Sequence, residues 1–293
     1  MVINNNEVNP RGISHRKEYG VALSIAGSDS SGGAGIQADI KTFSALGVYG
    51  ATAITAITAQ NTQGVHSQLA LPPQVVHEQV IAVMEDLHPF VIKIGMLANA
   101  EIATSVAEAL ANYPIPTILD PVIVSTSGHR LLSTEAMEVI KHRLLPIATL
   151  LTPNIPEMEA LANMPITTYE DKMRAAEHLF GYGVRAILLK GGHEVGDTKS
   201  DILFTRSAQG IESTTYTSDT ITTRNTHGTG CTLSSAIAAY IARGYDMAEA
   251  IRHAKEYVTE AIRHGADIAI GHGYGPVNHG FSPQTMYVYY ENE

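Results

Sequence analysis

The chain has little cysteine, little positive charge and no long apolar run, and each shortage excludes a class of protein. A single cysteine, Cys231, among 293 residues rules out an internal disulfide framework and a multi-cysteine zinc site. Lys and Arg number 19 against 29 Asp and Glu, and this formal charge of −10 argues against nucleic acid or an anionic membrane as the main partner. No stretch approaches about eighteen uninterrupted apolar residues, so we expect no membrane span.

Several familiar signatures are missing as well. The 13 histidines form no cluster of metal ligands, and "HEQVI" at 77–81 lacks the second histidine of a zinc hydrolase. The sequence contains no G-x-S-x-G elbow of a serine hydrolase. The first twenty residues are polar and lack the apolar segment of a secretory signal. We therefore expect a mobile tail over residues 1–18 and a cytoplasmic protein.

Apolar, β-rich runs alternate with segments of helical periodicity along nearly the whole chain. The pattern predicts strands at 21–27, 51–60, 90–97, 117–122, 149–154 and 186–192, and helices at 35–47, 72–87, 99–112, 133–145, 170–181 and 246–265. Strands that are apolar throughout are typical of a parallel sheet covered by helices on both faces. Segment 201–218 breaks the rhythm and is expected to form a hairpin at an antiparallel edge. Without a linker or an internal repeat, residues 19–293 are expected to form one domain.

The expected helix at 170–181 has a recognisable start. Thr167 precedes it, and Glu170 follows three positions later, which is the spacing of a capping box.

Glycine-rich and polar segments follow the expected strands, at the edge where ligands bind in open α/β sheets. "AGSDSSGGAGIQAD" at 26–39 matches neither standard phosphate fingerprint, so a ligand loop and a flexible turn are equally compatible with it. Asp39, on the helix that follows, is a candidate to face a ligand. Lys190 ends an apolar strand, where a charge favours an anionic partner such as phosphate; the alternative is an ammonium that reaches water. His193 and His227, next to glycines, are candidates to line the same site.

The segment "THGTGC" at 226–231 carries a stronger signal. Gly228 and Gly230 precede a helix of small residues, whose free N–H groups and dipole would stabilise negative charge that develops during a reaction. A thiol at that place should have a lowered pKa. Cys231 is therefore a candidate base or nucleophile, against the default of a small, inert, buried side chain.

"TPNIPE" at 152–157 supplies a second candidate site. Asn154 and Glu157 begin a helix, and Glu157 either stabilises that helix's N-terminus or reaches a magnesium ion, directly or through water. Asp120 in "LDPV" would add a second oxygen ligand.

Six segments follow one another along the chain in this order: "SIAGSDSSGGAGIQADIKTF", "TAQNT", "KIGML", "TPNIPE", "LLKGGH" and "NTHGTGCTLSSAIAA". Together they closely resemble the hydroxymethylpyrimidine/phosphomethylpyrimidine kinases of thiamine biosynthesis, in the ribokinase-like superfamily, over about residues 19–280. The resemblance implies a ribokinase-like three-layer α/β/α sandwich with a central, mostly parallel sheet. It also implies ATP-dependent phosphorylation, with Mg²⁺, of 4-amino-5-hydroxymethyl-2-methylpyrimidine to its monophosphate and then to the diphosphate, in a homodimer.

The resemblance assigns roles to matching positions. It implies that the pyrimidine is read by Gln60 and Asp39, in a pocket lined by Gly27, Met96 and Val122. It implies nucleotide contacts for Asn154, Lys190 and Thr229, and Mg²⁺ contacts for Glu157 and Asp120. Phosphoryl transfer would fall to Cys231, the anion-hole residues Gly228 and Gly230, and Lys190. A glutamine suits the first role because its amide offers both an acceptor and a donor to an aminopyrimidine edge.

Cys231 stands where ribokinases and many pyridoxal kinases carry Asp. Our hypothesis is that the thiol suits the second phosphorylation, whose anionic nucleophile a fixed carboxylate would repel by roughly a few kcal/mol. Three other functions stay open from the sequence: a pyridoxine kinase, alone or as a second activity; a non-catalytic pyrimidine-binding protein; and a Rossmann dehydrogenase. The missing fingerprint after the first strand disfavours the last of these.

Overall fold

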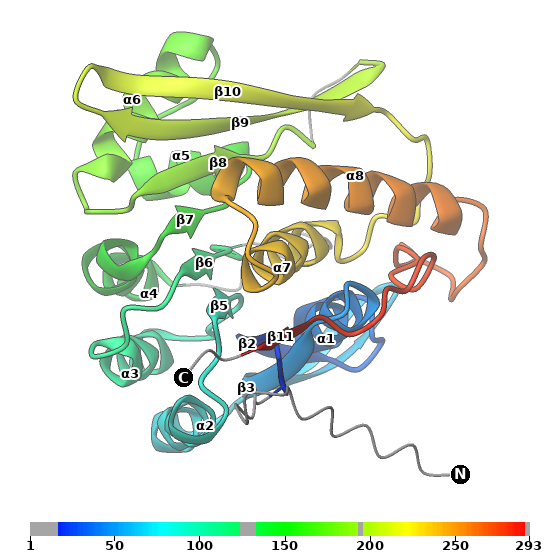
Figure 1. Ribbon diagram of the computed structural model, residues 1–293. Coiled ribbons are helices and arrows are strands. Elements are labelled where there is room, and N and C mark those ends of the chain that lie inside the picture. The colour runs from blue at the N-terminus through cyan, green and yellow to red at the C-terminus, as the bar shows by residue number, and fades with distance from the viewer. Residues whose placement is uncertain (1–16, 124–132, 193–195, 291–293) are drawn as a thin grey trace, which may run out of the picture.

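A computed structural model describes residues 17–123, 133–192 and 196–290. Its largest feature is a nine-stranded sheet in the order β10-β9-β8-β7-β6-β5-β2-β3-β4 (Figure 1). The strands are β2 (Val21–Asp29), β3 (Tyr49–Asn61), β4 (Gly64–Ala70), β5 (Val91–Ile94), β6 (Thr117–Leu119), β7 (Leu150–Leu151), β8 (Ala186–Leu189), β9 (Thr198–Ser207) and β10 (Gly210–Asp219). The six from β8 to β3 in this order run parallel, and β4, β9 and β10 pair antiparallel at the edges. The expected parallel sheet and the hairpin at its edge are confirmed.

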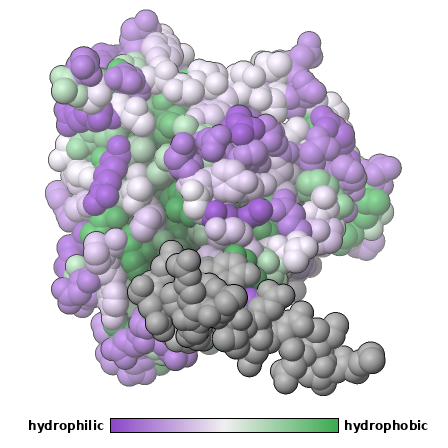
Figure 2. Space-filling model, viewed as in Figure 1, coloured by the Kyte–Doolittle hydropathy of each residue, from purple (hydrophilic) through white to green (hydrophobic). Residues whose placement is uncertain are grey.

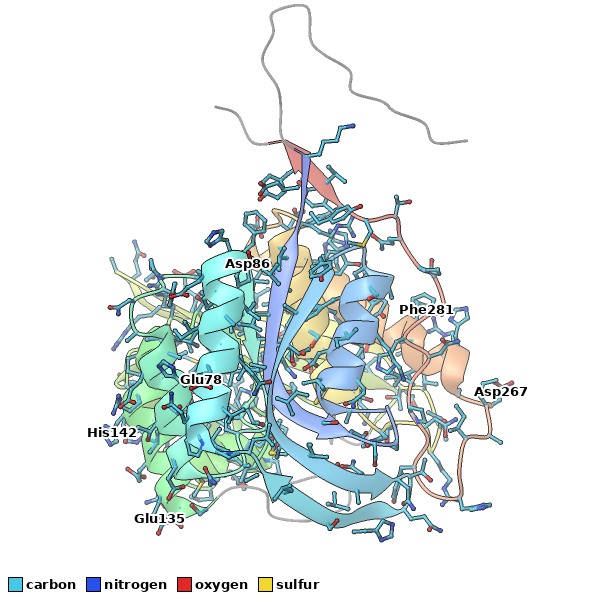
Figure 3. The ribbon with its side chains drawn as sticks, turned by 90° about the horizontal axis from the view of Figure 1, so that it is seen from below. Glu78, Asp86, Glu135, His142, Asp267 and Phe281 are labelled. Atoms are coloured by element: carbon cyan, nitrogen blue, oxygen red, sulfur yellow. The ribbon has the colours of Figure 1, made fainter. Side chains whose placement is uncertain are left out.

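Helices cover both faces of the sheet, as a three-layer sandwich requires. One face carries α1 (Gly35–Ala45), α7 (Thr229–Ala242) and α8 (Met247–Gly265). The other carries α2 (Pro73–Asp86), α3 (Ala100–Leu110), α4 (Thr134–Val139), α5 (Ile155–Ala162) and α6 (Tyr169–Phe180). Figure 3 shows the two sides, with Glu78 and Asp86 on α2 and with Asp267 and Phe281 beyond α1.

The apolar pattern of the central strands explains this sandwich. Val91 of β5 packs in the core beneath α1, α7 and α8, whereas Ile92 and Ile94 pack in the core beneath α2 to α6. Successive side chains of a strand point to opposite faces, so a strand covered on both sides is apolar at every position. The outer surface is mostly hydrophilic in the view of Figure 2, with a smaller apolar band left of centre.

Two helix predictions need correction. The expected helix at 133–145 is α4 followed by a π-helical turn at Ile140–Leu144 and a 3₁₀ turn at Leu145–Ile147, where Pro146 has no N–H to continue an α-helix. The capping box of α6 uses Thr168 and Asp171 instead of the expected pair one residue earlier. Asp171 takes the capping role because its carboxylate accepts hydrogen bonds from two backbone N–H groups, those of Thr167 at 3.0 Å and Thr168 at 2.9 Å.

The ends of the described chain meet in a second, two-stranded sheet. β1 (Lys17–Tyr19) pairs antiparallel with β11 (Val288–Tyr290). Residues 17 and 18, which fall in the predicted tail, gain strand partners instead, and residues 1–16 lie outside the described residues. The Tyr289 hydroxyl donates to the Glu18 carboxylate at 2.6 Å, and the Tyr289 ring packs edge-on against Phe90.

Within the described ranges, no helix combines the length and the apolar character needed to cross a membrane.

Candidate active site

A cavity of about 930 Å³ opens at the carboxyl ends of the parallel strands, where open α/β sheets bind their ligands. It collects all but one of the predicted site residues that the structure describes, among them Gly27, Gln60, Met96, Asp120, Val122, Asn154, Glu157, Lys190, Gly228, Thr229, Gly230 and Cys231. His227 lines it too, and His193 lies outside the described residues. The exception is Asp39.

The N-terminus of α7 forms one wall of the cavity. Gly228 is its N-cap and has φ +81°, a left-handed conformation that favours glycine. A Cβ at Gly228 would lie 1.8 Å from the carbonyl oxygen of Gly33, so the 226–230 loop and the loop at 29–35 touch through their backbones. At Gly230, a Cβ would lie 3.4 Å from Nζ of Lys190. The free N–H groups of α7 and the Lys190 ammonium therefore face the same space, which suits an anion.

Lys190 has the anionic partner that its position required. Its Nζ lies 2.8 Å from Oδ1 of Asp120 and 3.7 Å from Oε2 of Glu157. Burial alone would lower the pKa of Lys190, but the charges of Asp120 and Glu157 and the hydrogen bond to Asp120 together outweigh that effect and raise it. Burial acts to raise the pKa of Asp120 and the charge of Lys190 acts to lower it, and the pKa lies below its ordinary value. Lys190 is thus a fixed ammonium in the cavity wall, and the alternative of a side chain that reaches water is wrong.

Glu157 stabilises the N-terminus of α5, which is the first of the two roles that the sequence left open. Its N–H donates to Oδ1 of Asn154 at 2.8 Å, and its Oε2 accepts from the Asn154 N–H at 2.8 Å, which is a complete capping box. The same carboxylate also lines the cavity beside Lys190. Burial, together with the charge of Asp120, raises the pKa of Glu157. A further cation close to these two carboxylates would relieve that repulsion.

The donor set fits magnesium that arrives with phosphates. Asp120 and Glu157 both approach Lys190, so their hard oxygen donors share one corner of the cavity. In the described part of the chain, no group of three or more His, Cys, Asp and Glu side chains could hold a metal by itself. One or two carboxylates completed by substrate phosphates and water are a usual environment for Mg²⁺.

Asp39 does not reach the cavity, which corrects its predicted contact with the substrate. Its side chain is fully buried and accepts from Lys93 Nζ at 2.8 and 2.9 Å, from Ser24 at 2.5 Å and from Ser235 at 2.6 Å. Lys93 lines the cavity in its place. Four short hydrogen bonds hold the Asp39 carboxylate inside the protein, so its partner Lys93 lines the cavity and Asp39 does not.

Cys231 also departs from expectation, because the pKa of its thiol is raised to about 11. Burial is the largest cause, Lys93 opposes it, and the charges of Asp120 and Asp39 add to it. The helix N-terminus does not outweigh these effects. The thiol is protonated at neutral pH and is no general base there.

Gln60, Gly27 and Met96 also line the cavity. A Cβ at Gly27 would lie 2.4 Å from the terminal methyl of Met96, so only glycine leaves this wall flat. The Gln60 backbone is fixed by Ser30, whose hydroxyl donates to the Gln60 carbonyl at 2.7 Å and accepts from its N–H at 2.8 Å. The Gln60 amide thus has a defined place in the cavity.

Two features of the site were not predicted from the sequence. Lys93 interrupts the apolar run "FVIKIGML", and a charge inside a buried strand was the available signal. A second ion pair joins Lys255 Nζ to Oδ2 of Asp201 at 2.7 Å, and Oδ1 of Asp201 accepts from the Gly191 N–H at 2.9 Å. No local motif marks that pair, because its members come from α8 and β9. It lines the cavity near an apolar patch on α8.

Comparison with known proteins places these features in context. The family model described as phosphomethylpyrimidine kinase matches residues 29–278. The hydroxymethylpyrimidine/phosphomethylpyrimidine kinase of Escherichia coli is 45% identical over 88% of this chain and 96% of its own length. A thiamine biosynthesis bifunctional protein of Geobacter sulfurreducens is 46% identical over 89% of this chain, which spans 52% of that longer protein.

Solved structures agree with these relatives. The phosphomethylpyrimidine kinase of Clostridium difficile has a TM-score of 0.73 and 44% identity over 83% of this chain and 99% of its own. A pyridoxal kinase of Staphylococcus aureus, solved with pyridoxal, has a TM-score of 0.79 and 32% identity over 94% of this chain and 100% of its own.

Proposed function

This chain belongs to the phosphomethylpyrimidine kinase family, and we propose that it transfers the γ-phosphoryl group of ATP to 4-amino-5-hydroxymethyl-2-methylpyrimidine and then to the resulting monophosphate. The observation that carries the proposal is one cavity lined by two chemically different groups, both next to the loop that begins α7. The Gln60 amide nitrogen lies 3.4 Å from His227 Nε2, and the Lys190 ammonium would lie 3.4 Å from a Cβ at Gly230. A neutral aromatic acceptor and a polyanionic donor can therefore be held in one space.

The part of the cavity around Gln60 suits a flat, hydrogen-bonding ring. The Gln60 amide offers an acceptor and a donor, as an aminopyrimidine edge requires. Gly27 and Met96 form a close-packed wall against which a ring can lie, with Val122 also lining the space. We assign these four residues to substrate binding.

The part of the cavity around Lys190 suits phosphates. Phosphoryl transfer proceeds through a loose transition state, so catalysis depends on positioning and on stabilising charge. Lys190 and the N–H groups behind Gly228 and Gly230 supply positive charge where it is needed. The apolar patch on α8, at Val258 and Ile262, lines the same cavity and can take an apolar base surface. We assign Asn154, Thr229 and Lys190 to the nucleotide.

Cys231 keeps its place beside the reacting oxygens in a revised role. A thiol with a pKa of about 11 is neutral at pH 7, so it neither attacks nor removes a proton. Its neutrality serves the second step, because a carboxylate at this position would repel an anionic acceptor by roughly a few kcal/mol. The nucleophile in our proposal is the substrate's own hydroxyl or phosphate oxygen.

Asp120 and Glu157 would hold Mg²⁺, directly or through water, which would neutralise phosphate charge when bound. Until ATP arrives, both carboxylates face Lys190. Two carboxylates against one ammonium leave this corner an excess of negative charge, which a bound cation would offset.

We also propose a homodimer. At the sheet edge, Ile57 of β3 and Leu69 of β4 are direct partners, yet they are 49% and 65% exposed. Exposed apolar side chains on an edge strand favour association with a second copy. Light scattering after chromatography would give the mass, and Leu69→Lys should reduce it to that of the monomer. We place the enzyme in the cytoplasm, where ATP is available to it.

The decisive experiment measures ADP release with Mg²⁺ and ATP, offering hydroxymethylpyrimidine, its monophosphate, pyridoxine and ribose in parallel. Turnover of both pyrimidines is the expected result. Turnover of pyridoxine alone would overturn the pyrimidine assignment in favour of the pyridoxal kinase relatives. No turnover, with pyrimidine binding intact by calorimetry, would indicate a binding protein. Lys190→Met is the matched variant, and it should abolish turnover while leaving pyrimidine binding intact.

A further inference from the structure

The carboxylate of Asp29, at the end of β2, organises the glycine loop that follows. It accepts from Ser31 N–H at 2.8 Å, from Ala34 N–H at 2.8 Å and from Gly33 N–H at 3.1 Å. The side chain is 3% exposed. Burial acts to raise the pKa of Asp29, but hydrogen bonds from His227, Ser31 and Ala34 outweigh it and lower the pKa to about 2. Asp29 is therefore a carboxylate that can only accept hydrogen bonds.

His227 is bonded to this carboxylate from the other glycine loop. Its Nε2 lies 2.8 Å from Oδ2 of Asp29, so Nε2 carries the hydrogen of that bond. The ring is tightly enclosed, because a Cβ at Gly33 would lie 2.4 Å from its Cδ2. The His227 N–H also donates to the Gly275 carbonyl at 3.0 Å. The position of the His227 ring and the nitrogen that carries its hydrogen are thus both fixed.

Gln60 lies against the same ring nitrogen. Its Nε2 is 3.4 Å from Nε2 of His227, and its Oε1 is 3.2 Å from the Thr58 hydroxyl. The His227 nitrogen has given its hydrogen to Asp29 and has no lone pair for Gln60. Within the described part of the chain, no acceptor takes a hydrogen from the Gln60 amide, so both amide hydrogens stay available inside the cavity.

We propose that His227, oriented by Asp29, is a positioning residue: its ring, fixed 3.4 Å from the Gln60 amide nitrogen, limits by packing where that amide can move and offers it no hydrogen-bond acceptor. The same bond latches the loop at 226–230 to the loop at 29–35, which already touch where Gly228 meets Gly33. The latch thereby links the part of the cavity around Gln60 to the N-terminus of α7. This inference rests on the proposed function, since it gives Gln60 a pyrimidine to read.

The latch makes a prediction that separates the two substrates. Without it, the histidine nitrogen is free to accept a hydrogen from Gln60, or the amide is free to swing. Either change removes about one hydrogen bond from the pyrimidine. His227→Leu and Asp29→Asn should therefore raise KM for hydroxymethylpyrimidine about tenfold and change KM for ATP by less than about twofold. His227→Gln should stay within about threefold of the parent, because its amide nitrogen can replace Nε2 as donor to Asp29.

His279→Gln is the matched control. His279 is the other histidine buried among the described residues, its Nε2 lies 3.0 Å from the Thr232 hydroxyl, and it is absent from the main cavity wall. A merely structural role predicts that His227→Leu and His279→Gln alter kcat and both KM values alike, and that result would overturn the proposal. So would an unchanged KM for the pyrimidine in His227→Leu.

A second readout needs no substrate. The N–H groups of Ser31, Gly33 and Ala34 should exchange with deuterium about tenfold faster in His227→Leu, and at the parent rate in His227→Gln and His279→Gln. Unchanged exchange in His227→Leu refutes the latch. If the parent enzyme fails to turn over the pyrimidine, the proposed function fails, and the exchange experiment still decides the latch.

Discussion

The single thiol gives the sharpest test of the electrostatics in this cavity. With one cysteine in the chain, a thiol-selective alkylating reagent reports on Cys231 alone. Its pKa is about 11, against an ordinary value of 9.0. Because only the thiolate reacts, the reactive fraction at pH 7 falls from about one in 10² to about one in 10⁴. Iodoacetamide should modify the folded protein about 100-fold more slowly than the unfolded chain.

The assay follows alkylation by intact mass between pH 6.5 and 9.5, in buffer and in urea. The folded protein should react faster by about tenfold for each unit of pH, with no plateau in this range, because the pH stays below the pKa. The urea sample should begin to level off near pH 9. A plateau in the folded protein below pH 8.5, or equal rates in the two samples at pH 7, would refute our account of burial and of the charges around the thiol.

Three further predictions follow from the same region. Lys93→Met should lower the free energy of unfolding by about 3–5 kcal/mol in urea titrations, because it leaves the buried Asp39 carboxylate without its cation; a loss below about 1 kcal/mol would contradict this. Gly228→Ala should abolish kinase activity in the ADP-release assay, since its Cβ has no room, whereas Gly280→Ala, whose Cβ would lie 4.0 Å from Asn278 Oδ1 and away from the cavity wall, should retain it. Cys231→Asp should slow phosphorylation of the monophosphate at least about tenfold more than that of the alcohol; equal effects in initial-rate assays would remove the reason for a thiol.

The sequence predicted the architecture well, because the fold depends on features that repeat along the chain. A buried parallel strand is apolar at every position, and "VALSIAG" and "AILLKGG" satisfy that rule without knowledge of their neighbours. The predictions of secondary structure were wrong where two neighbouring residues could take the same role or where a strand lacks an apolar pattern. Thr167 and Thr168 both offer a cap, and only the reach of the Asp171 carboxylate to two N–H groups decides between them. β4 was missed because an exposed edge strand lacks an apolar pattern.

The site was predicted less completely, because its electrostatics depend on residues far apart in the sequence. Motif position placed Asp39 on the substrate, but motif position cannot show that Lys93, 54 residues away, approaches its carboxylate from β5. Burial and the distant charges of Asp120 and Asp39 raise the pKa of Cys231, whereas the helix N-terminus, the one local influence visible in the sequence, argued for a lowered value. The His227–Asp29 bond spans 198 residues and has no local signature.

The short pairing of β1 with β11 has a consequence for how this fold can be rearranged. Lys17 lies opposite Tyr290, and directly opposed Cα atoms in such a ladder are only about 4.5–5.5 Å apart. A brief peptide link between these positions would close the backbone into a ring without disturbing the large sheet. The ring could then be cut at the exposed turn between β9 and β10, at residues 208–209, giving a circular permutant in which Cys231 precedes Gln60 in translation order. Gln60 and Cys231 lie far apart in the sequence, so the activity of this permutant would show whether assembly of the cavity depends on which is synthesised first.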